Sequence, residues 1–360
     1  MKRLTLSNFK AYIKPVTVNF SDITLNVGMN SVGKSTVVQA LLLMRQAYDE
    51  LKKLEGVAKK DVRVLLNGPY DLQLGDFNHI TTGAESFSFD LDGTKFAFRE
   101  NEDKYSVSFA GEENALPNGV LFSPHFYYIN AERLGPRNYQ DIQGGDESSL
   151  CGYHGEHTFE VINQNSQAAV QERRRFSAEM PFFSKQLELW MDYIVPGIIF
   201  HANDDVVSRT ATLRIRQTTL DTDWGSPHNY GFGISYLLPI IVTGLLAEPG
   251  SVFVVENPEA HLHPSGQSRI GKFLAQVAFS GVTVLVETHS EHVVNGARLQ
   301  SLEMHTAPER ICINNFSLAE DGPYVERLTL SESMDILSWP DGFFDQQVKD
   351  LAELRQLRRR

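Results

Sequence analysis

A run of nine residues near the N-terminus, GMNSVGKST at 28–36, has the glycine, lysine and hydroxyl spacing of a phosphate-binding loop, G-x-x-x-x-G-K-[ST]. In such a loop the glycines let main-chain amides turn toward phosphate oxygens. The positive end of the following helix favours the same anion. The pattern therefore predicts a site for a nucleoside triphosphate and leaves the base undetermined.

The polar side chains of this loop have distinct expected roles. Lys34 should neutralise the terminal phosphates, Ser35 should place its hydroxyl on Mg²⁺, and Thr36 should lie near the first phosphate. The residues expected to contact the nucleotide here are Asn30, Ser31, Gly33, Lys34, Ser35 and Thr36.

Two apolar runs later in the chain end in groups suited to phosphate chemistry. Glu256 ends SVFVVE, and a P-loop protein places the acid that holds the Mg²⁺ water shell at the tip of a neighbouring parallel strand. A phosphate-cleaving site would be expected to carry a second acid beside it, yet Asn257 is an amide. His289 follows the next apolar run, where an imidazole can hydrogen-bond the γ-phosphate.

Histidine and cysteine clusters leave metal binding open as a minor alternative. Zinc sites need three or four ligands at set spacing, and phosphate chemistry already accounts for one of these histidines. CGYHGEH (151–157) lies in a polar, glycine-rich section with no identifiable fourth ligand, which favours a surface coincidence. The residues concerned are Cys151, His154 and His157, the pair His261 and His263, and the pair His289 and His292.

The elements that must position these groups alternate between strand and helix. ITLNVG (23–28) predicts a strand before the loop, and 35–56 has helical spacing after it. Two apolar strands separated by one helix predict parallel neighbours joined by a crossover. The last third is expected to contain a helix at 236–247, strands at 251–256 and 282–288, and a helix at 266–280.

The middle of the chain lacks this regular alternation of strand and helix. Short strands broken by turn residues are expected over 62–132, a mobile loop over 136–165, and helices interrupted by Pro181 over 166–195. A strand is expected at 210–218.

Composition restricts the classes of function. The formal charge of −12 argues against binding nucleic acid or anionic membrane through overall attraction. Two distant cysteines make no disulfide framework, so a reducing cytoplasm is the expected location. The N-terminus lacks the apolar region of a secretory signal, and the longest apolar segment is shorter than the roughly 20 residues of a membrane helix.

Several motifs together resemble RecF-like and OLD-like ABC ATPases, which are relatives of SMC head domains. The resemblance covers most of the chain, and the conjunction of ENPEAHLHP with ETHSEH is its most specific part. The segments that carry it are GMNSVGKST (28–36), NYGFGISYLLPI (229–240), VVENPEAHLHP (254–264), VETHSEHVVNGARL (286–299) and WPDGFFDQ (339–346).

The resemblance implies an α/β fold. It would be a two-lobed ABC head with a mostly parallel P-loop sheet, an antiparallel strand lobe and an inserted helical section. The head would span 1–345, with nucleotide-binding segments at 1–60 and 205–330, an insertion at 61–204, and a basic tail at 346–360. Such heads form homodimers around two ATP molecules, so ATP and Mg²⁺ are the implied cofactors.

Site residues carry over by position. Glu256 would be the acid of the second Walker motif and a Mg²⁺ residue with Ser35, and His289 would be the switch histidine. GFGIS (231–235) occupies the place of the signature motif but departs from it. It leaves Ser235, or the amides of Gly231 and Gly233, as candidate contacts to the partner's nucleotide at the start of a helix.

Asn257 stands where many ABC ATPases carry the glutamate that polarises the attacking water. An amide cannot accept a proton, so hydrolysis should be slow unless another base such as Glu259 takes part. Lys10 matches a position near the nucleotide, and Gln73 is a candidate for the Q-loop glutamine. Either could equally be an ordinary surface residue.

These features favour an ATP-dependent switch over a motor. We expect no fused TOPRIM nuclease and no coiled-coil arms, so the resemblance points to bacterial defence against phage or plasmids with a separate effector, a nuclease or a toxin. A RecF-like repair or loading factor is the alternative, and a transporter subunit is disfavoured. DNA contact stays open, through QERRR (171–175) or RQLRRR (355–360).

Overall fold

The computed structural model describes residues 1–54, 60–111, 119–142, 150–218, 223–320, 322–340 and 342–358. The α-helices are α1 (Lys34–Lys52), α2 (Phe77–Ile80), α3 (Thr158–Gln164), α4 (Phe183–Ile194), α5 (Phe232–Leu246), α6 (Pro264–Phe279), α7 (Glu291–Glu303) and α8 (Gln346–Leu357). The strands are β1 (Arg3–Ser7), β2 (Val16–Asn19), β3 (Ile23–Gly28), β4 (Lys60–Leu65), β5 (Ser86–Leu91), β6 (Thr94–Glu100), β7 (Ser106–Gly111), β8 (Phe126–Ile129), β9 (Tyr139–Asp141), β10 (Ile198–Asp205), β11 (Thr210–Gln217), β12 (Val252–Glu256), β13 (Thr283–Glu287), β14 (Ile311–Ala319) and β15 (Gly322–Leu328).

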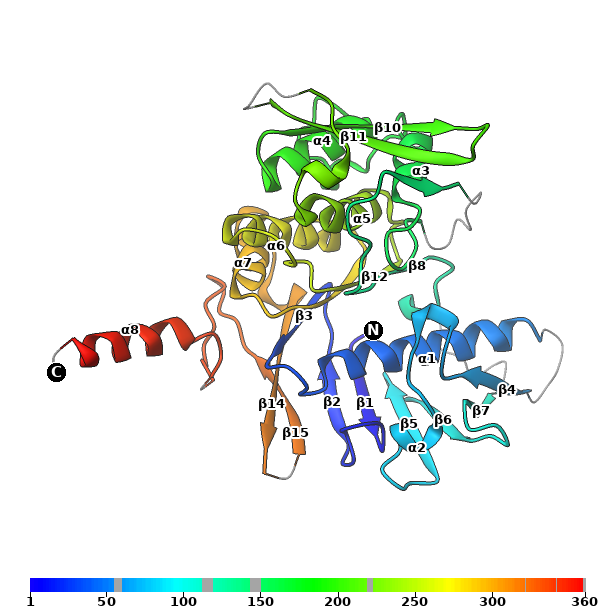
Figure 1. Ribbon diagram of the computed structural model, residues 1–360. Helices are drawn as coiled ribbons and strands as arrows, with labels where there is room; N and C mark the ends of the chain where they lie inside the picture. The colour runs from blue at the N-terminus through cyan, green and yellow to red at the C-terminus, as the bar shows by residue number, and fades with distance from the viewer. Residues whose placement is uncertain are drawn as a thin grey trace.

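A six-stranded sheet in the order β15-β14-β3-β13-β12-β8 carries the phosphate loop (Figure 1). Its strands are parallel except β15, which pairs antiparallel with β14. The predicted pairing of the two apolar strands is confirmed, because β12 and β13 are parallel neighbours and α6 is the crossover between them. The α/β fold class is therefore confirmed.

The order of this sheet corrects one expectation. The strand ending in Glu256 was expected to neighbour the phosphate-loop strand, but β13 lies between β12 and β3. The strand tips therefore run from the loop to Glu287 and then to Glu256. In addition, β8 falls within the segment expected as an insertion, 61–204, yet pairs in parallel with β12. That segment thus contributes directly to the nucleotide sheet.

The parallel sheet is buried on both faces and separates two hydrophobic cores. On β12, Val252 and Val254 pack into the core that α1 shares with the antiparallel strands, whereas Phe253 and Val255 pack into the core beneath α4 to α7. A strand covered on both sides needs apolar residues at every position. This explains the unbroken apolar run in the sequence.

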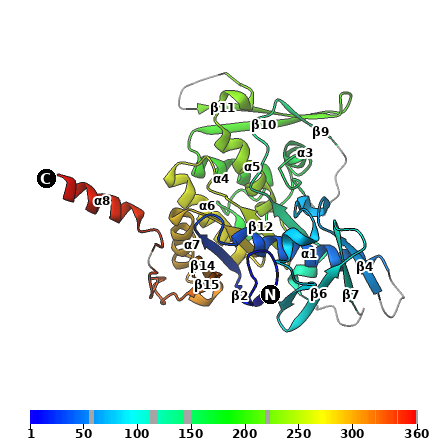
Figure 2. The ribbon, with the colours of Figure 1, turned by 60° about the horizontal axis from the view of Figure 1, so that its bottom comes forward.

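A second six-stranded sheet, β2-β1-β5-β6-β7-β4, is antiparallel and packs against α1. It is the expected strand-rich lobe, and residues 1–20 supply two of its strands. Its buried face is lined by close phenylalanine rings, among which Phe87 and Phe98 stack with centroids 5.0 Å apart. Figure 2 places this sheet on the side of α1 away from α4 and α5.

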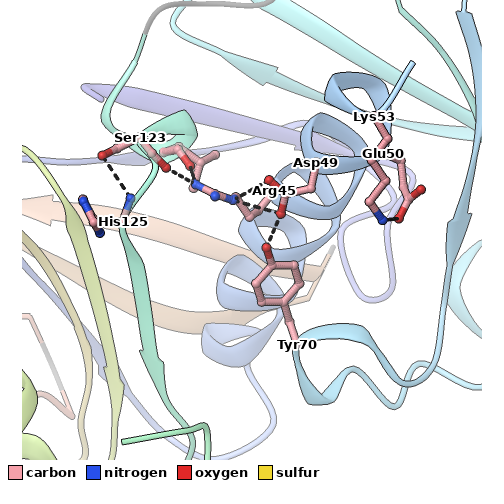
Figure 3. Close-up of polar contacts among 8 residues, drawn as sticks. Arg45, Asp49, Glu50, Lys53, Tyr70, Ser123 and His125 are labelled. Carbon is pink, nitrogen blue, oxygen red and sulfur yellow. Dashed lines mark hydrogen bonds and ion pairs between the residues drawn. The ribbon is translucent and has the colours of Figure 1, made fainter. Parts of the chain in front are cut away.

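A buried arginine ties helix α1 to the segment that precedes β8. Arg45 donates through Nε to Asp49, 3.1 Å away, and through Nη1 to the carbonyl oxygens of Leu121, 3.1 Å away, and Ser123. Figure 3 shows Arg45 reaching from α1 to Ser123, with Tyr70 donating to Asp49. Because the segment after Ser123 enters β8, the phosphate-loop helix and β8 are fixed relative to each other.

The region expected to be a mobile loop and then helices contains regular structure of another kind. Within 136–165, β9 and α3 form, and residues 143–149 lie outside the described part. β9 pairs with β11 in a three-stranded sheet, β10-β11-β9. Of 166–195 only α4 is an α-helix, since the earlier part holds a short 3-10 turn, Glu172–Arg174.

The middle arginine of the basic segment 171–175 is buried. Arg174 is 2% exposed, its Nε donates to Ser280 Oγ at 2.6 Å, and its Nη1 donates to the carbonyl oxygen of Ala247. A guanidinium held in the core cannot reach a DNA phosphate. Arg174 therefore drops out of the expected DNA contact, whereas Arg173 is exposed and Arg175 partly exposed.

Helix α8 projects away from the rest of the molecule in both ribbon views (Figures 1 and 2). None of its residues is buried. It corresponds to the expected basic tail, whose last two arginines lie outside the described residues. No helix in the described ranges has the length and apolar character required to cross a membrane.

Candidate nucleotide site

The phosphate loop lies between β3 and α1, as the sequence predicts. Two glycines explain its shape. Gly28 has φ 135° and a Cβ there would come 2.2 Å from the Phe316 carbonyl oxygen, while Gly33 has φ 99° and a Cβ would come 2.4 Å from the Tyr12 hydroxyl. Both positions therefore require glycine, for conformation and for space. Tyr12 donates a hydrogen bond to the Gly33 carbonyl oxygen at 3.0 Å.

Lys34 spans the loop. Its side chain is 3% exposed, and Nζ donates to the carbonyl oxygens of Gly28 at 2.9 Å and Met29 at 2.5 Å. Burial lowers its pKa below 10.5, while the nearby Glu287 acts in the opposite direction. The ammonium group is held inside the loop, where a bound phosphate can exchange for the two carbonyl oxygens.

The loop opens into a cavity of about 430 Å³ that gathers most of the expected nucleotide and acid residues. Lys10, which the resemblance places near the nucleotide, lines this cavity. Glu259, Ser235 and Gly233 do not line it. The lining residues are Lys10, Ala11, Asn30, Ser31, Gly33, Lys34, Ser35, Thr36, Ala131, Glu256, Asn257, Glu287 and His289.

Glu256 is anchored from the neighbouring strand. The Tyr128 hydroxyl on β8 donates to Glu256 Oε1 at 3.0 Å. Burial raises the pKa of Glu256 above 4.5, and the hydrogen bond from Tyr128 opposes that effect.

Arg133 fixes the main chain at the end of β12, and sequence reasoning missed it. It is 3% exposed and donates to the carbonyl oxygens of Glu256 at 2.6 Å and Asn257 at 2.7 Å. Its guanidinium lies 5.2 Å from the centre of the Tyr236 ring in α5. It therefore links the acidic strand end to the helix that carries the signature-like segment.

Glu287, at the end of β13, is a second site residue missed from the sequence. Ser35 Oγ donates to Glu287 Oε1 at 2.8 Å, and Oε2 is buried without a hydrogen-bond partner in the described structure. Burial, and then the charge of Glu256, raise the pKa of Glu287 from 4.5 to about 7. The signal that could have revealed it is its place at the end of an apolar strand two residues before His289.

Asn257 occupies a left-handed conformation, φ 45°. Among non-glycine residues, asparagine is enriched in that region. Its main-chain nitrogen donates to the Glu287 carbonyl oxygen at 2.8 Å, and its side-chain Oδ1 is buried without a partner in the described structure. The left-handed backbone conformation is therefore one reason for an asparagine at position 257, apart from any role in chemistry.

Glu259 positions the segment that carries His289. Its Oε2 accepts from Thr288 Oγ1 and its Oε1 accepts from the His289 main-chain nitrogen, both at 2.7 Å. Burial, followed by the charge of Lys34, lowers the pKa of His289 below 6.5. The imidazole is therefore mainly neutral at pH 7 and has one ring N–H to donate to a phosphate oxygen.

The signature-like residues lie in a different place. Gly233 lines a cavity of about 520 Å³ beside His261, and a Cβ at Gly233 would come 2.7 Å from the His261 carbonyl oxygen. Close packing therefore requires glycine there. Gln73, the Q-loop candidate, is exposed in the strand-rich lobe and does not line the nucleotide cavity.

The transition-metal interpretations find no support in the described ranges, which contain no group of three or more histidine, cysteine, aspartate or glutamate side chains able to hold a metal ion. Cys151 is fully buried and so does not lie on the surface as expected, while His154 and His157 are partly exposed. Mg²⁺ is a different case. It uses one or two carboxylates together with phosphate oxygens and water, and a hydroxyl beside buried carboxylates fits that requirement.

Comparison with known families agrees with this site. Residues 1–129 match a family described as "AAA ATPase domain", and residues 160–295 match one described as "AAA domain, putative AbiEii toxin, Type IV TA system". Residues 319–354 match "Protein of unknown function (DUF3696)". A search of curated proteins finds no match.

Among solved structures, the fold is similar to an SMC head bound to the C-terminal winged-helix domain of ScpA. The TM-score is 0.53 at 14% identity, covering 93% of this chain and 99% of that one. An SMC head from Thermotoga maritima gives 0.44 at 13% identity, covering 91% and 99%. One bound to the C-terminal domain of ScpA derived from Pyrococcus furiosus gives 0.49 at 13%, covering 98% and 99%.

The first of these likenesses shows the fold, and the two ATPase families show the kind of domain. Together with the phosphate loop, the two family matches support an AAA-type ATPase, and the solved structure shows that its fold is like that of an SMC head.

Proposed function

We propose that this chain binds ATP with Mg²⁺ in the cavity at the phosphate loop and hydrolyses it slowly, as a dimeric switch. The observation that carries the proposal is the convergence of Lys34, Ser35, two strand-end acids and His289 on one cavity. In this arrangement Lys34 and the loop amides bind the phosphates, and His289 donates to the terminal one.

Loss of Lys34 tests nucleotide binding. Lys34→Ala should abolish ATP affinity measured by titration calorimetry. Lys52→Ala, which removes an exposed lysine from the same helix, should leave it intact. Undiminished affinity in Lys34→Ala would overturn the assignment of the site.

Slow turnover follows from the chemistry of the strand end. Asn257 cannot take a proton from water, and both carboxylate oxygens of Glu259 already accept hydrogen bonds from Thr288 and His289. Glu256→Gln should remove Mg²⁺-dependent hydrolysis. Glu259→Gln should halt turnover with ATP binding intact if Glu259 is the base, whereas unchanged turnover would assign it a positioning role only.

Dimerisation around ATP is part of the same proposal. The resemblance to ABC heads supports it, and so does the separation of Ser235 and Gly233 from the cavity of their own chain. Light scattering after gel filtration should show dimers with Mg²⁺ and ATP, and fewer with Ser235→Arg. A strict monomer at micromolar concentration would contradict this part.

The cellular role we propose is defence against phage or plasmids through a separate effector, a nuclease or a toxin. The match of residues 160–295 to the family whose description includes an AbiEii toxin supports it. Cells carrying the gene with its neighbours should resist infection or plasmid transfer, and Lys34→Ala should abolish that resistance. Equal resistance in the variant would refute an ATP-dependent role.

A further inference from the structure

We propose that Glu287 holds the Mg²⁺ of the bound nucleotide together with Ser35. The inference rests on the proposed ATP-binding function. The carboxylate that binds the metal would then come from β13, which lies between β3 and β12.

The geometry places Glu287 nearer the phosphate loop than Glu256. In register, Glu287 on β13 lies opposite Asn26 on β3, so its strand borders the phosphate-loop strand directly. Its Oε1 already accepts from Ser35 Oγ at 2.8 Å. Glu256 lies one strand farther away, and Tyr128 holds one of its oxygens.

The second oxygen of Glu287 needs an explanation. Oε2 is buried and has no hydrogen-bond partner in the described structure, although a buried carboxylate oxygen normally accepts at least one. A glutamine would serve as well as an acceptor for Ser35. An acid at this position, with one oxygen left without a partner, is better explained by a cation ligand or a ligand to a cation-bound water.

The charge balance of the cavity points in the same direction. Glu256 and Glu287 are register partners on adjacent strands, so two acids lie side by side with Lys34 as the nearby cation. Lys34 Nζ is already engaged by two carbonyl oxygens. A small divalent ion prefers such hard oxygen ligands, and phosphate oxygens would complete its coordination. Its positive charge would offset the negative charges of the two carboxylates.

The test measures metal affinity directly, without turnover. Mn²⁺ replaces Mg²⁺, and its binding to protein loaded with a non-hydrolysable ATP analogue is followed by electron paramagnetic resonance. Glu287→Gln should weaken Mn²⁺ binding by about 10–100-fold, the range seen when groups supporting a metal site are removed. Affinity for the analogue in EDTA should be unchanged, which also reports that the variant is folded.

A matched control is Glu160→Gln. Glu160 is a buried glutamate on α3, also with one unpartnered oxygen in the described structure, and it does not line the nucleotide cavity. It should keep wild-type Mn²⁺ affinity. If Glu287→Gln does not fold, Glu287→Asp should retain the charge with a shorter reach and show an intermediate affinity.

The outcomes separate the two proposals. Wild-type Mn²⁺ affinity in Glu287→Gln, or wild-type affinity in Glu287→Asp, would overturn the role of Glu287 and leave ATP binding standing. Failure of the wild-type protein to bind the analogue in EDTA and in Mn²⁺ alike would overturn the proposed function itself.

Discussion

Replacing Glu287 by glutamine should stabilise the nucleotide-free protein, and the gain should depend on pH. Glutamine keeps an acceptor for Ser35 Oγ and removes the buried negative charge. Glu287 is 5% exposed, and its pKa is raised from 4.5 to about 7 by burial and by Glu256. The difference corresponds to about 3 kcal/mol, since each pKa unit is worth about 1.4 kcal/mol.

The direction of this pH dependence follows from the difference in proton binding between the folded and the unfolded chain. Between pH 4.5 and about 7 the unfolded chain has lost this proton while the folded chain keeps it, so raising the pH through this window reduces stability. The full penalty of ~3 kcal/mol is present above pH 7 and absent below pH 4.5. The free energy of unfolding of Glu287→Gln should therefore exceed that of the wild type by up to that amount at pH 8 and by little at pH 4.5.

Urea denaturation followed by tryptophan fluorescence, at several pH values and without nucleotide, measures this difference. Other titrating groups are common to both proteins and cancel when the two are subtracted. A difference that does not change with pH would refute the reasoning, and so would a less stable variant at pH 8. Either result would mean that Glu287 is ionised at no cost in the folded state.

Substitutions at three further positions, Arg133, Gly296 and Arg45, test the packing of the fold. Arg133→Met should lower the free energy of unfolding by about 3 kcal/mol, because two main-chain carbonyls at the end of β12 lose a charged donor. Arg133→Lys should recover only part of this, since an ammonium cannot fork to both, and full recovery would count against the geometry. Gly296→Ala should destabilise by at least about 3 kcal/mol, because its Cβ would come 1.9 Å from the Ser268 carbonyl oxygen. Gly119→Ala, with its nearest neighbour at 4.0 Å, is the control and should show a small change in the same urea titration. Arg45→Met should loosen α1 from the segment entering β8, and faster amide hydrogen exchange around residues 121–123 is the expected readout.

The sequence determined the local elements of the nucleotide site. The phosphate loop, the strands on either side of α6 and the positions of Glu256 and His289 could be predicted, because glycine spacing and unbroken apolar runs reflect local backbone and burial requirements. The buried fate of Arg174 could not be predicted, because a basic triplet looks the same whether its middle residue faces solvent or the core.

Only the tertiary structure decided which groups meet at the loop. The sequence predicts that β12 and β13 are parallel neighbours, but not which of them borders β3, because lateral strand order is set by packing across the sheet. That order brings Glu287 to Ser35 and leaves Glu256 one strand away. The same holds for Arg133, whose contacts with the end of β12 join segments more than 120 residues apart in the chain.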